Sequence, residues 1–182
     1  MLIETAAVRI AEGIKRQVPD HKSSVNILKH AIAVILNVVL IIALTLLIAF
    51  FTGHMGRAAT ALIGFALLRQ FTGGIHLKTG EWCVLVTTAL FTLVSFIELS
   101  AFYVQILNVL SMVLVAVFAP SKIENQSRIP RRHYPKLRVI GVLIVLANVL
   151  IQSQTLAVVF FVQALSLIHR KEVKRHVTDQ QS

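Results

Sequence analysis

A histidine and the only cysteine of the chain, His76 and Cys83, lie seven residues apart in a glycine-rich stretch. A thiolate is a strong nucleophile, and an imidazole can take up the thiol proton and later protonate a leaving amine. Imidazole suits both steps because its reference pKa of about 6.5 lies near neutral pH. The pair indicates cysteine-peptidase chemistry, although each residue alone is more often structural, a lone cysteine being usually a small buried hydrophobe.

The catalytic interpretation sets a geometric condition on the chain around these two residues. On an unbroken helix seven residues rise about 10.5 Å, whereas a hydrogen bond between thiol and imidazole needs about 3 Å. Glycines at positions 73, 74 and 80 make a regular helix costly here, so we predict a broken helix over residues 72–82. Cys83 then stands at or near the start of the next helix. A helix N-terminus favours the thiolate, and Arg69 and Lys78 add positive potential.

A metal site is the weaker interpretation of the same residues. One cysteine and one nearby histidine, with Glu81 between them, do not make a zinc site without further ligands. The His-Glu-x-x-His pattern of metalloproteases is absent from the sequence. The single cysteine also excludes an internal disulfide. We therefore expect neither a metal nor another cofactor.

The composition indicates which elements must position this pair. The hydrophobic fraction is 56% and the charged fraction 14%, whereas soluble domains are about a quarter charged. We predict an all-α, polytopic membrane protein that forms a single membrane domain over residues 1–182. Its parts are a cytosolic segment 1–30, a transmembrane bundle 31–169 with a polar loop at 120–136, and a basic cytosolic tail 170–182. Apolar runs predict about six transmembrane helices, at residues 31–52, 57–71, 83–98, 102–119, 137–151 and 154–169.

Residues 1–18 form a further predicted helix, which is amphipathic. Ile3, Ala7, Ile10 and Ile14 recur at helical spacing, and the charged residues lie mostly elsewhere around the helix. Such a helix can lie flat in the headgroup region of a membrane or pack against the rest of the protein, and the sequence leaves both open. No cleavable signal is expected, because about thirty mixed residues precede the first long apolar run.

The positions of the basic residues predict the topology. Every Lys and Arg except Arg57 lies in residues 1–30, 69–82 or 120–138 or in the tail after residue 169. The positive-inside rule then places both termini and the glycine-rich break on the cytosolic side of the membrane. This arrangement accounts for the net charge of +10. Nucleic-acid binding is disfavoured, because basic and aromatic residues are not interleaved as they are where bases stack.

Two motifs of this chain allow a comparison with known families. The first combines Arg69, Gly73-Gly74-Ile75-His76 and Cys83. The second, in the polar loop, consists of Ala119-Pro120, then Glu124-Asn125, then Pro130. Together with the length, the number of spans and the basic cytosolic loops, they resemble the AgrB family, accessory gene regulator protein B, of Gram-positive bacteria. The chain departs from many members at Leu77, where they have alanine after the histidine.

The resemblance implies a role in quorum sensing, as a thiol protease of the bacterial cell membrane that cuts an AgrD-type propeptide. Cys83 would attack the peptide bond after the future ring, with His76 acting first as base and then as acid. The acidic C-terminal tail would leave, and an acyl-enzyme thioester would remain. The propeptide's own cysteine or serine would then close a thiolactone or a lactone to give the autoinducing peptide.

Further residues are candidates for supporting roles under this resemblance. Arg69, Gly73 and Gly74 are candidates for binding the substrate or stabilising the oxyanion. Glu81 and Asn125 are candidates for a third catalytic residue, although Glu81 could instead pair with Arg69. Four basic residues are candidates for docking the acidic tail, or serve topology alone: Arg128, Arg131, Arg132 and Lys136.

Other functions are compatible with a small helical membrane protein. A transporter or channel would need charged residues inside the spans, where the main polar residues are Asn37, Asn108 and Asn148, a residue type that more often serves helix packing. A membrane scaffold would not need Cys83 as a nucleophile, and neither would an acyltransferase that uses an interfacial histidine. The spacing of arginine, histidine and cysteine favours the peptidase. Small residues in the span 57–71 also make a homodimer an open alternative to a monomer.

Overall fold

A computed structural model describes residues 2–20, 22–74, 79–121 and 130–168 of the chain. Within these ranges the regular elements are helices, and the one contact of β type is an isolated bridge between Gly73 and Ser121. In chain order the helices are α1 (Leu2–Gln17), α2 (Val25–Thr52), α3 (Met55–Thr72), α4 (Gly80–Phe96), α5 (Ala101–Phe118), the 3-10 helix η2 (Arg131–His133), α6 (Tyr134–Ile151) and α7 (Gln154–Leu165). The predicted all-α class is confirmed for this part of the chain.

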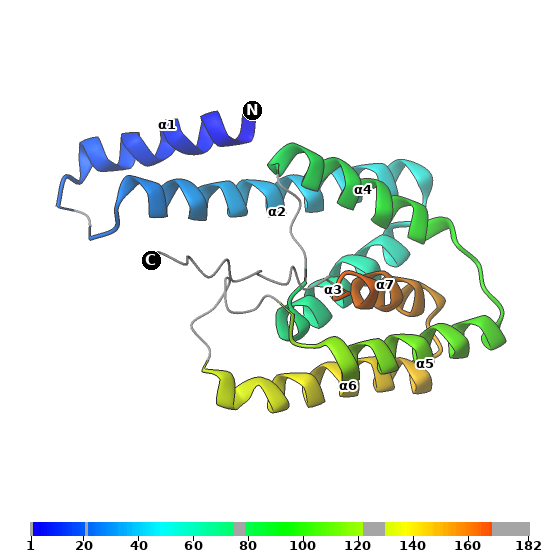
Figure 1. The fold of residues 1–182 in the computed structure, drawn as a ribbon. Helices are drawn as coiled ribbons and strands as arrows, with labels where there is room; N and C mark the ends of the chain where they lie inside the picture. Colours follow the sequence, from blue (N-terminus) through cyan, green and yellow to red (C-terminus); the bar gives the residue numbers. More distant parts are fainter. Residues whose placement is uncertain (1, 21, 75–78, 122–129, 169–182) are drawn as a thin grey trace, which may run out of the picture.

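The N-terminal helix α1 lies alongside α2 (Figure 1). It buries Ile3, Ala7 and Ala11, which recur at helical spacing, and its contacts are with α2 and α4. The apolar stripe of α1 is therefore packed on the protein, which matches the second of the two placements that the sequence left open. A position of α1 in the membrane interface stays a prediction.

The first long helix, α2, is capped at both ends. The Ser24 side chain accepts a hydrogen bond from the Ile27 amide at 3.4 Å, and Gly53 ends the helix in the left-handed conformation with φ of +74°. The helix is 28 residues long, so it begins before the predicted span 31–52. It exposes many large apolar side chains, as a helix in contact with lipid does: Val34, Ile35, Val38, Val39, Leu47, Phe50 and Phe51.

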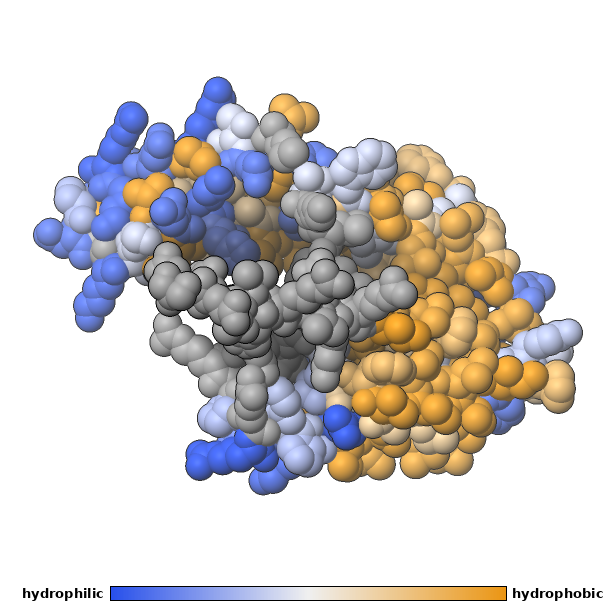
Figure 2. Space-filling view, viewed as in Figure 1, coloured by the Kyte–Doolittle hydropathy of each residue, from blue (hydrophilic) through white to orange (hydrophobic). Residues whose placement is uncertain are grey.

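Three helices, α2, α5 and α6, are long and apolar enough to cross a membrane. Helices α4 and α7 are also apolar but shorter, at 17 and 12 residues. Figure 2 shows a broad band of hydrophobic side chains along the bundle, with hydrophilic side chains at its two ends. The chain is thus built as a membrane protein, whereas the count of six spans over α2–α7 stays a prediction.

The short helix α7 lies in the middle of the bundle, where it contacts α3, α4, α5 and α6 (Figure 1). Its partner α3 presents the small residues Ala58, Ala61 and Gly64 on its buried side. A Cβ atom at Gly64 would collide with the side chain of Leu156 of α7. The small residues of α3 therefore allow close helix contact, as the sequence predicted.

Two predicted boundaries are wrong by a few residues. The loop expected over 120–136 ends earlier, because η2 and then α6 begin before its predicted end. Pro135 lies in the first turn of α6, where no N–H bond is needed and its fixed φ suits a helix, so Lys136 stands on α6. At the other end of the chain α7 stops at Leu165, short of the predicted boundary at residue 169.

The asparagines inside the predicted spans join helices to one another. Asn148 of α6 donates from Nδ2 to Asn108 Oδ1 of α5 at 2.9 Å and to the Ser153 carbonyl at 3.0 Å. Its own Oδ1 accepts from the Ser153 amide at 3.1 Å. These bonds join α5, the end of α6 and the start of α7 to one another. They support the packing role for these two residues rather than a transport path.

Candidate active site

The glycine-rich break between α3 and α4 is confirmed, but it is shorter than predicted. α3 ends at Thr72, and α4 begins at Gly80, so Gly80 belongs to a helix instead of bending the chain. Its missing side chain serves another purpose, because a Cβ atom there would lie 2.9 Å from Oδ1 of Asn37 on α2. His76 and Lys78 lie outside the described residues. The predicted hydrogen bond between His76 and Cys83 therefore stays a prediction.

Gly73 and Gly74 turn the chain sharply at the end of α3. Their φ angles are +72° and +130°, in a region that residues with a Cβ atom rarely adopt. The Gly73 amide donates to the Arg69 carbonyl at 2.9 Å and closes the helix. The paired glycines of the motif are therefore explained by backbone geometry. A side chain at position 74 would also meet Ser166 Oγ at 2.7 Å.

The turn is tied to the segment after α5 by a short β-type contact. The Gly74 amide donates to the Ser121 carbonyl at 3.0 Å, and the Ser121 amide donates to the Thr72 carbonyl at 2.9 Å. Beside it, Arg138 of α6 donates from Nε to the Ala119 carbonyl at 2.6 Å. The two motifs that were far apart in the sequence, the paired glycines and Ala119-Pro120, are thus neighbours in the fold.

Cys83 stands in the first turn of α4, as predicted for a nucleophile at a helix start. Its amide makes the first hydrogen bond of the helix, to the Thr79 carbonyl at 3.1 Å. The thiol is free and partly buried. The positive end of the α4 dipole therefore lies on the same helix turn as the sulfur.

Arg69, in the last turn of α3, lies on the same end of the bundle. Its guanidinium is within electrostatic range of the Cys83 thiol and lies over the Phe65 ring, 5.5 Å from the centroid. It also donates from one terminal nitrogen to Gln163 Oε1 at 3.4 Å. The arginine and the cysteine of the first motif are therefore brought together by α3 and α4.

Gln163 of α7 is a site residue that the sequence interpretation missed. Its side chain is fully buried, and its Nε2 donates to the Gly73 carbonyl at 2.6 Å and to Thr72 Oγ1 at 3.1 Å. The signal was available, because Gln163 is a polar residue in the last apolar run of the chain. A polar side chain inside a span calls for partners on neighbouring helices.

Glu81 is half-buried at the start of α4 and contacts the N-terminal helix. Its Oε1 accepts a hydrogen bond from the Ile3 amide at 3.2 Å. Hydrogen bonds from its own backbone amide and then from that of Ile3 hold the pKa of this carboxyl below its usual value. Glu81 and Arg69 thus have different hydrogen-bond partners here. The role of Glu81 as the residue that orients His76 stays a prediction.

The basic residues expected to dock an acidic tail are only partly described. Arg128 lies outside the described residues, as does Asn125. Arg131 and Arg132 belong to η2, and Lys136 lies in the first turn of α6. The backbone contact between Gly74 and Ser121 brings the end of α3 and the end of α5 together. The helices that follow them, α4 with Cys83 and α6 with the basic residues, therefore begin at the same end of the bundle.

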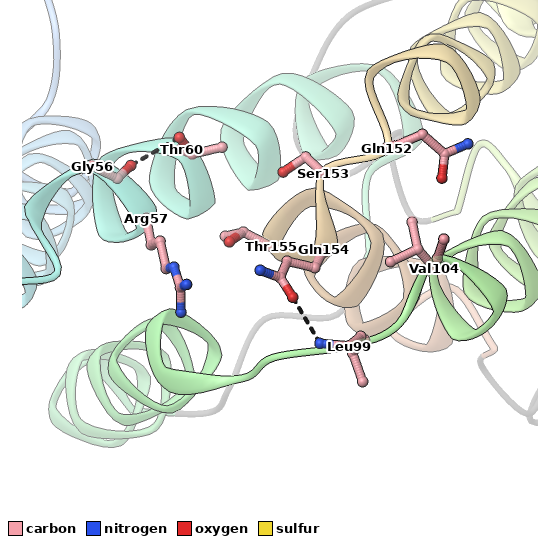
Figure 3. A pocket seen from close by; sticks show the side chains of 10 residues that line it. Gly56, Arg57, Thr60, Leu99, Val104, Gln152, Ser153, Gln154 and Thr155 are labelled. Atoms are coloured by element: carbon pink, nitrogen blue, oxygen red, sulfur yellow. Dashed lines mark hydrogen bonds between the residues drawn. The ribbon is translucent and has the colours of Figure 1, made fainter.

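Two cavities lie at opposite ends of the bundle. One of about 430 Å³ is lined by polar side chains at the starts of α3 and α7, Arg57, Gln154 and Thr155 among them (Figure 3). Among the described residues its lining contains neither cysteine nor histidine, so this cavity lies away from the predicted catalytic pair. The other, of about 320 Å³, is lined by Leu2, Thr79, Glu81 and Trp82, directly before Cys83. Cys83 follows Trp82 in the sequence but is not among the residues that line this cavity.

Fold and site together define a helical membrane protein whose single thiol stands at a helix start, beside an arginine and a glycine-ordered turn. The family model of AgrB, accessory gene regulator B, matches residues 7–169, and the chain therefore belongs to the AgrB family. It is also 26% identical over 152 residues to a protein of Halalkalibacterium halodurans described as AgrB-like. The aligned region covers 82% of this chain and 77% of that protein. No solved structure matches the chain. Membership of this family connects the protein with peptide processing in agr quorum sensing.

Proposed function

We propose that this protein is a membrane cysteine endopeptidase that removes the C-terminal tail of an AgrD-type propeptide and passes the remainder on to cyclisation. The observation that carries the proposal is the position of Cys83, in the first turn of α4 and within electrostatic range of Arg69. Helix start and guanidinium both favour the thiolate that the chemistry needs. Family membership supports the choice of substrate.

The first half of the proposed reaction is acylation of the enzyme. His76 takes the proton from the Cys83 thiol, and the sulfur attacks the carbonyl carbon of the scissile peptide bond. The resulting oxyanion collapses, the carbon–nitrogen bond breaks, and His76 gives its proton to the leaving amine. The tail departs with a new N-terminus, and the rest of the propeptide stays on Cys83 as a thioester.

The second half of the reaction is closure of the ring. The thiol of the propeptide's own cysteine, or the hydroxyl of a serine, attacks the thioester carbonyl and loses its proton, and Cys83 leaves as a thiolate that is reprotonated. A thioester exchanged for a thiolactone keeps most of its activation, whereas an ester on a catalytic serine would make this step uphill. This difference gives a chemical reason for a cysteine at position 83.

Arg69 and the first amides of α4 are our candidates for stabilising the oxyanion. The first N–H groups of a helix have no intrahelical partner and point toward an anion at its start. The amides of Gly73 and Gly74 already donate to the Arg69 and Ser121 carbonyls. We therefore assign the two glycines to substrate positioning, through the shape of the turn, rather than to direct donation.

The proposal also covers how the substrate reaches the site. With both termini in the cytosol and α2–α7 as six spans, the site faces the cytosolic surface of the bacterial cell membrane. The cavity lined by Leu2, Thr79, Glu81 and Trp82 suits an apolar residue next to the scissile bond. The basic segment with Arg128, Arg131, Arg132 and Lys136 suits the acidic tail of the propeptide. A homodimer would repeat the same site in each subunit.

A cleavage assay tests the proposal. The full chain in membranes is mixed with the cognate propeptide, and released tail is measured by mass spectrometry for wild type, Cys83→Ser, His76→Ala and the control His54→Ala. His54 lies at the far end of α3, where its ring packs at a tilt against that of Phe96 with 4.5 Å between ring centroids. We expect wild type and His54→Ala to release the tail and the other two variants, inserted normally, to release none. Tail release by Cys83→Ser at the wild-type rate would refute the nucleophile and leave the scaffold alternative.

A further inference from the structure

We propose that Gln163 is a positioning residue of this site, which holds Arg69 and the Gly73–Gly74 turn in one arrangement beside Cys83. The catalytic effect of this positioning rests on the proposed function. Its geometry is independent of that function, because it concerns only a buried side chain and its hydrogen-bond partners. One of the two measurements below therefore needs no substrate.

The Gln163 side-chain amide uses both of its donors and its acceptor oxygen. A primary amide has two N–H donors and an oxygen that accepts two bonds. Nε2 donates to the Gly73 carbonyl at 2.6 Å and to Thr72 Oγ1 at 3.1 Å. Oε1 accepts from Arg69 at 3.4 Å, and Ser166 Oγ lies 3.2 Å from it, although the one hydroxyl hydrogen of Ser166 has a shorter acceptor in the Gln163 backbone carbonyl at 2.7 Å. The two bonds donated by Nε2 and the one accepted from Arg69 fix the orientation of the side-chain amide.

An amide is needed here because the partners differ in kind. The Gly73 carbonyl requires a donor, and the Arg69 guanidinium requires an acceptor, so no apolar or acceptor-only side chain serves both. Gln163 is fully buried in the centre of the bundle, where a polar group without partners is costly. Its presence where an apolar residue would fill the same space points to a task other than filling the core.

The task that the contacts indicate is positioning of both parts of the first motif. On one side, Gln163 fixes the peptide plane after Gly73, from which the chain continues toward His76. The fixed plane also directs the Gly74 amide toward the Ser121 carbonyl. On the other side, it fixes the guanidinium that lies within electrostatic range of Cys83. Small displacements of either part are expected to slow a reaction that depends on near-attack geometry.

The test uses Gln163→Leu and a matched control on the same helix, Gln154→Leu. Gln154 accepts a hydrogen bond from the Leu99 amide at 2.7 Å, at the other end of α7 (Figure 3). Both variants replace a glutamine that bonds another segment by leucine. A loss that follows only from weaker helix packing would therefore appear in both.

The first measurement is the rate at which iodoacetamide alkylates Cys83 in the full chain in membranes. Cys83 is the only cysteine, so the label has no other target. We expect Gln163→Leu to lower this rate at neutral pH by about threefold or more, because a displaced Arg69 stabilises the thiolate less. The control Gln154→Leu should keep the wild-type rate. A rate for Gln163→Leu that is unchanged or raised, or one matched by the control, would overturn the inference.

The second measurement is propeptide cleavage, with kcat and KM determined separately. We expect Gln163→Leu to lower kcat by about 10- to 100-fold and to change KM by less than about threefold, because geometry rather than binding is lost. Gln163→Glu, of the same size, serves if the leucine variant does not insert. It keeps an acceptor for Arg69 but has no donor for Gly73, so its kcat should also fall by about tenfold. A wild-type kcat in either variant would refute the role of Gln163 and leave the proposed peptidase activity intact. If the wild-type protein does not cleave the propeptide, the proposed peptidase activity is refuted, and the alkylation rate alone tests the role of Gln163.

Discussion

At the scale of single residues, the site depends on close packing around Gly74, which leaves no room for a side chain. Gly74 has φ of +130°, and a Cβ atom there would lie 2.7 Å from Ser166 Oγ and 3.3 Å from Gln163 Nε2. Residues with a side chain are strained in this conformation. The turn at Gly73 and Gly74 and the side chains of Gln163 and Arg69 therefore pack as one unit. A substitution at any of them should displace the others.

Replacing Gly74 by alanine should disrupt this unit. We expect Gly74→Ala to lower tail release by at least about tenfold and to destabilise the fold by ~1–3 kcal/mol, through strain and the clash with Ser166. Gly13→Ala is the control, because a Cβ atom at this helical glycine meets nothing within 4 Å. It should keep full activity and gain ~0.5–1 kcal/mol. Thermal unfolding in detergent and the cleavage assay check both, and an active Gly74→Ala protein would contradict the description of the turn.

The carboxylate of Glu81 gives a prediction for pH. Hydrogen bonds from its own amide and from the Ile3 amide lower its pKa below the usual value of 4.5. A lowered pKa means that the contribution of Glu81 to docking of α1 is complete above pH 4.5 and is lost as the pH falls through the lowered pKa. Trp82, the only tryptophan, lines the same cavity as Leu2 and should report this loss as a change in its fluorescence.

The isosteric variant Glu81→Gln separates this titration from general acid denaturation. Glutamine still accepts from the Ile3 amide but carries no charge to titrate, so its Trp82 emission should stay constant through the same pH interval. An identical acid transition in the variant and in wild type would show that another group attaches α1.

At the scale of elements, backbone hydrogen bonds hold the break in addition to the side chain of Gln163. The Thr72–Gly74 turn and Ser121 exchange two hydrogen bonds, of 2.9 and 3.0 Å, between the end of α3 and the segment after α5. Both bonds use main-chain atoms of Ser121. The side chain at position 121 should therefore have little effect on activity, whereas loss of the backbone N–H of this residue should lower it.

Proline and alanine at position 121 test this distinction. Ser121→Pro removes the N–H that donates to the Thr72 carbonyl, and we expect it to lower tail release by at least about tenfold. Ser121→Ala keeps both backbone bonds and should stay within about twofold of wild type. The two variants are compared in the cleavage assay after their insertion is verified. Equal activity of both would mean that the contact does not support the site.

The local parts of this fold could be predicted from the sequence, and the long-range parts could not. Apolar runs and the glycines at 53, 73 and 74 determine where helices exist and where they end, because these signals act between neighbouring residues. The start of α6 lies inside the loop predicted at 120–136, because a proline such as Pro135 suits a loop and a first helical turn alike. The bonds from Gln163 to Thr72 and Gly73 join residues about 90 positions apart, which no local pattern records.

At the scale of the whole molecule, the two ends of the bundle differ in charge and in chemistry. The end with Cys83 and Arg69 also carries the start of α6 with its basic residues. At the opposite end Arg57 is paired with Glu98 at 3.0 Å, beside the cavity of about 430 Å³. This asymmetry agrees with the positive-inside rule if the first end faces the cytosol.

Labelling of introduced cysteines tests this orientation. In a Cys83→Ala background, Ser153→Cys places a thiol between α6 and α7, and Lys136→Cys places one at the start of α6. A membrane-impermeant maleimide added to intact cells should label position 153 and should label position 136 only after the membrane is opened. The reverse pattern would invert the topology and put the candidate site outside the cell.

The central claim is that Cys83 forms a thioester with the propeptide, and intact-protein mass spectrometry tests it most directly. The full chain is mixed with a propeptide whose ring-closing residue is replaced by alanine, so that the thioester cannot be resolved by cyclisation. We expect a mass increase equal to the propeptide without its tail, removable by hydroxylamine, located at Cys83 and absent from Cys83→Ala. Tail release by the wild type without any such adduct, or an adduct that persists in Cys83→Ala, would contradict the account.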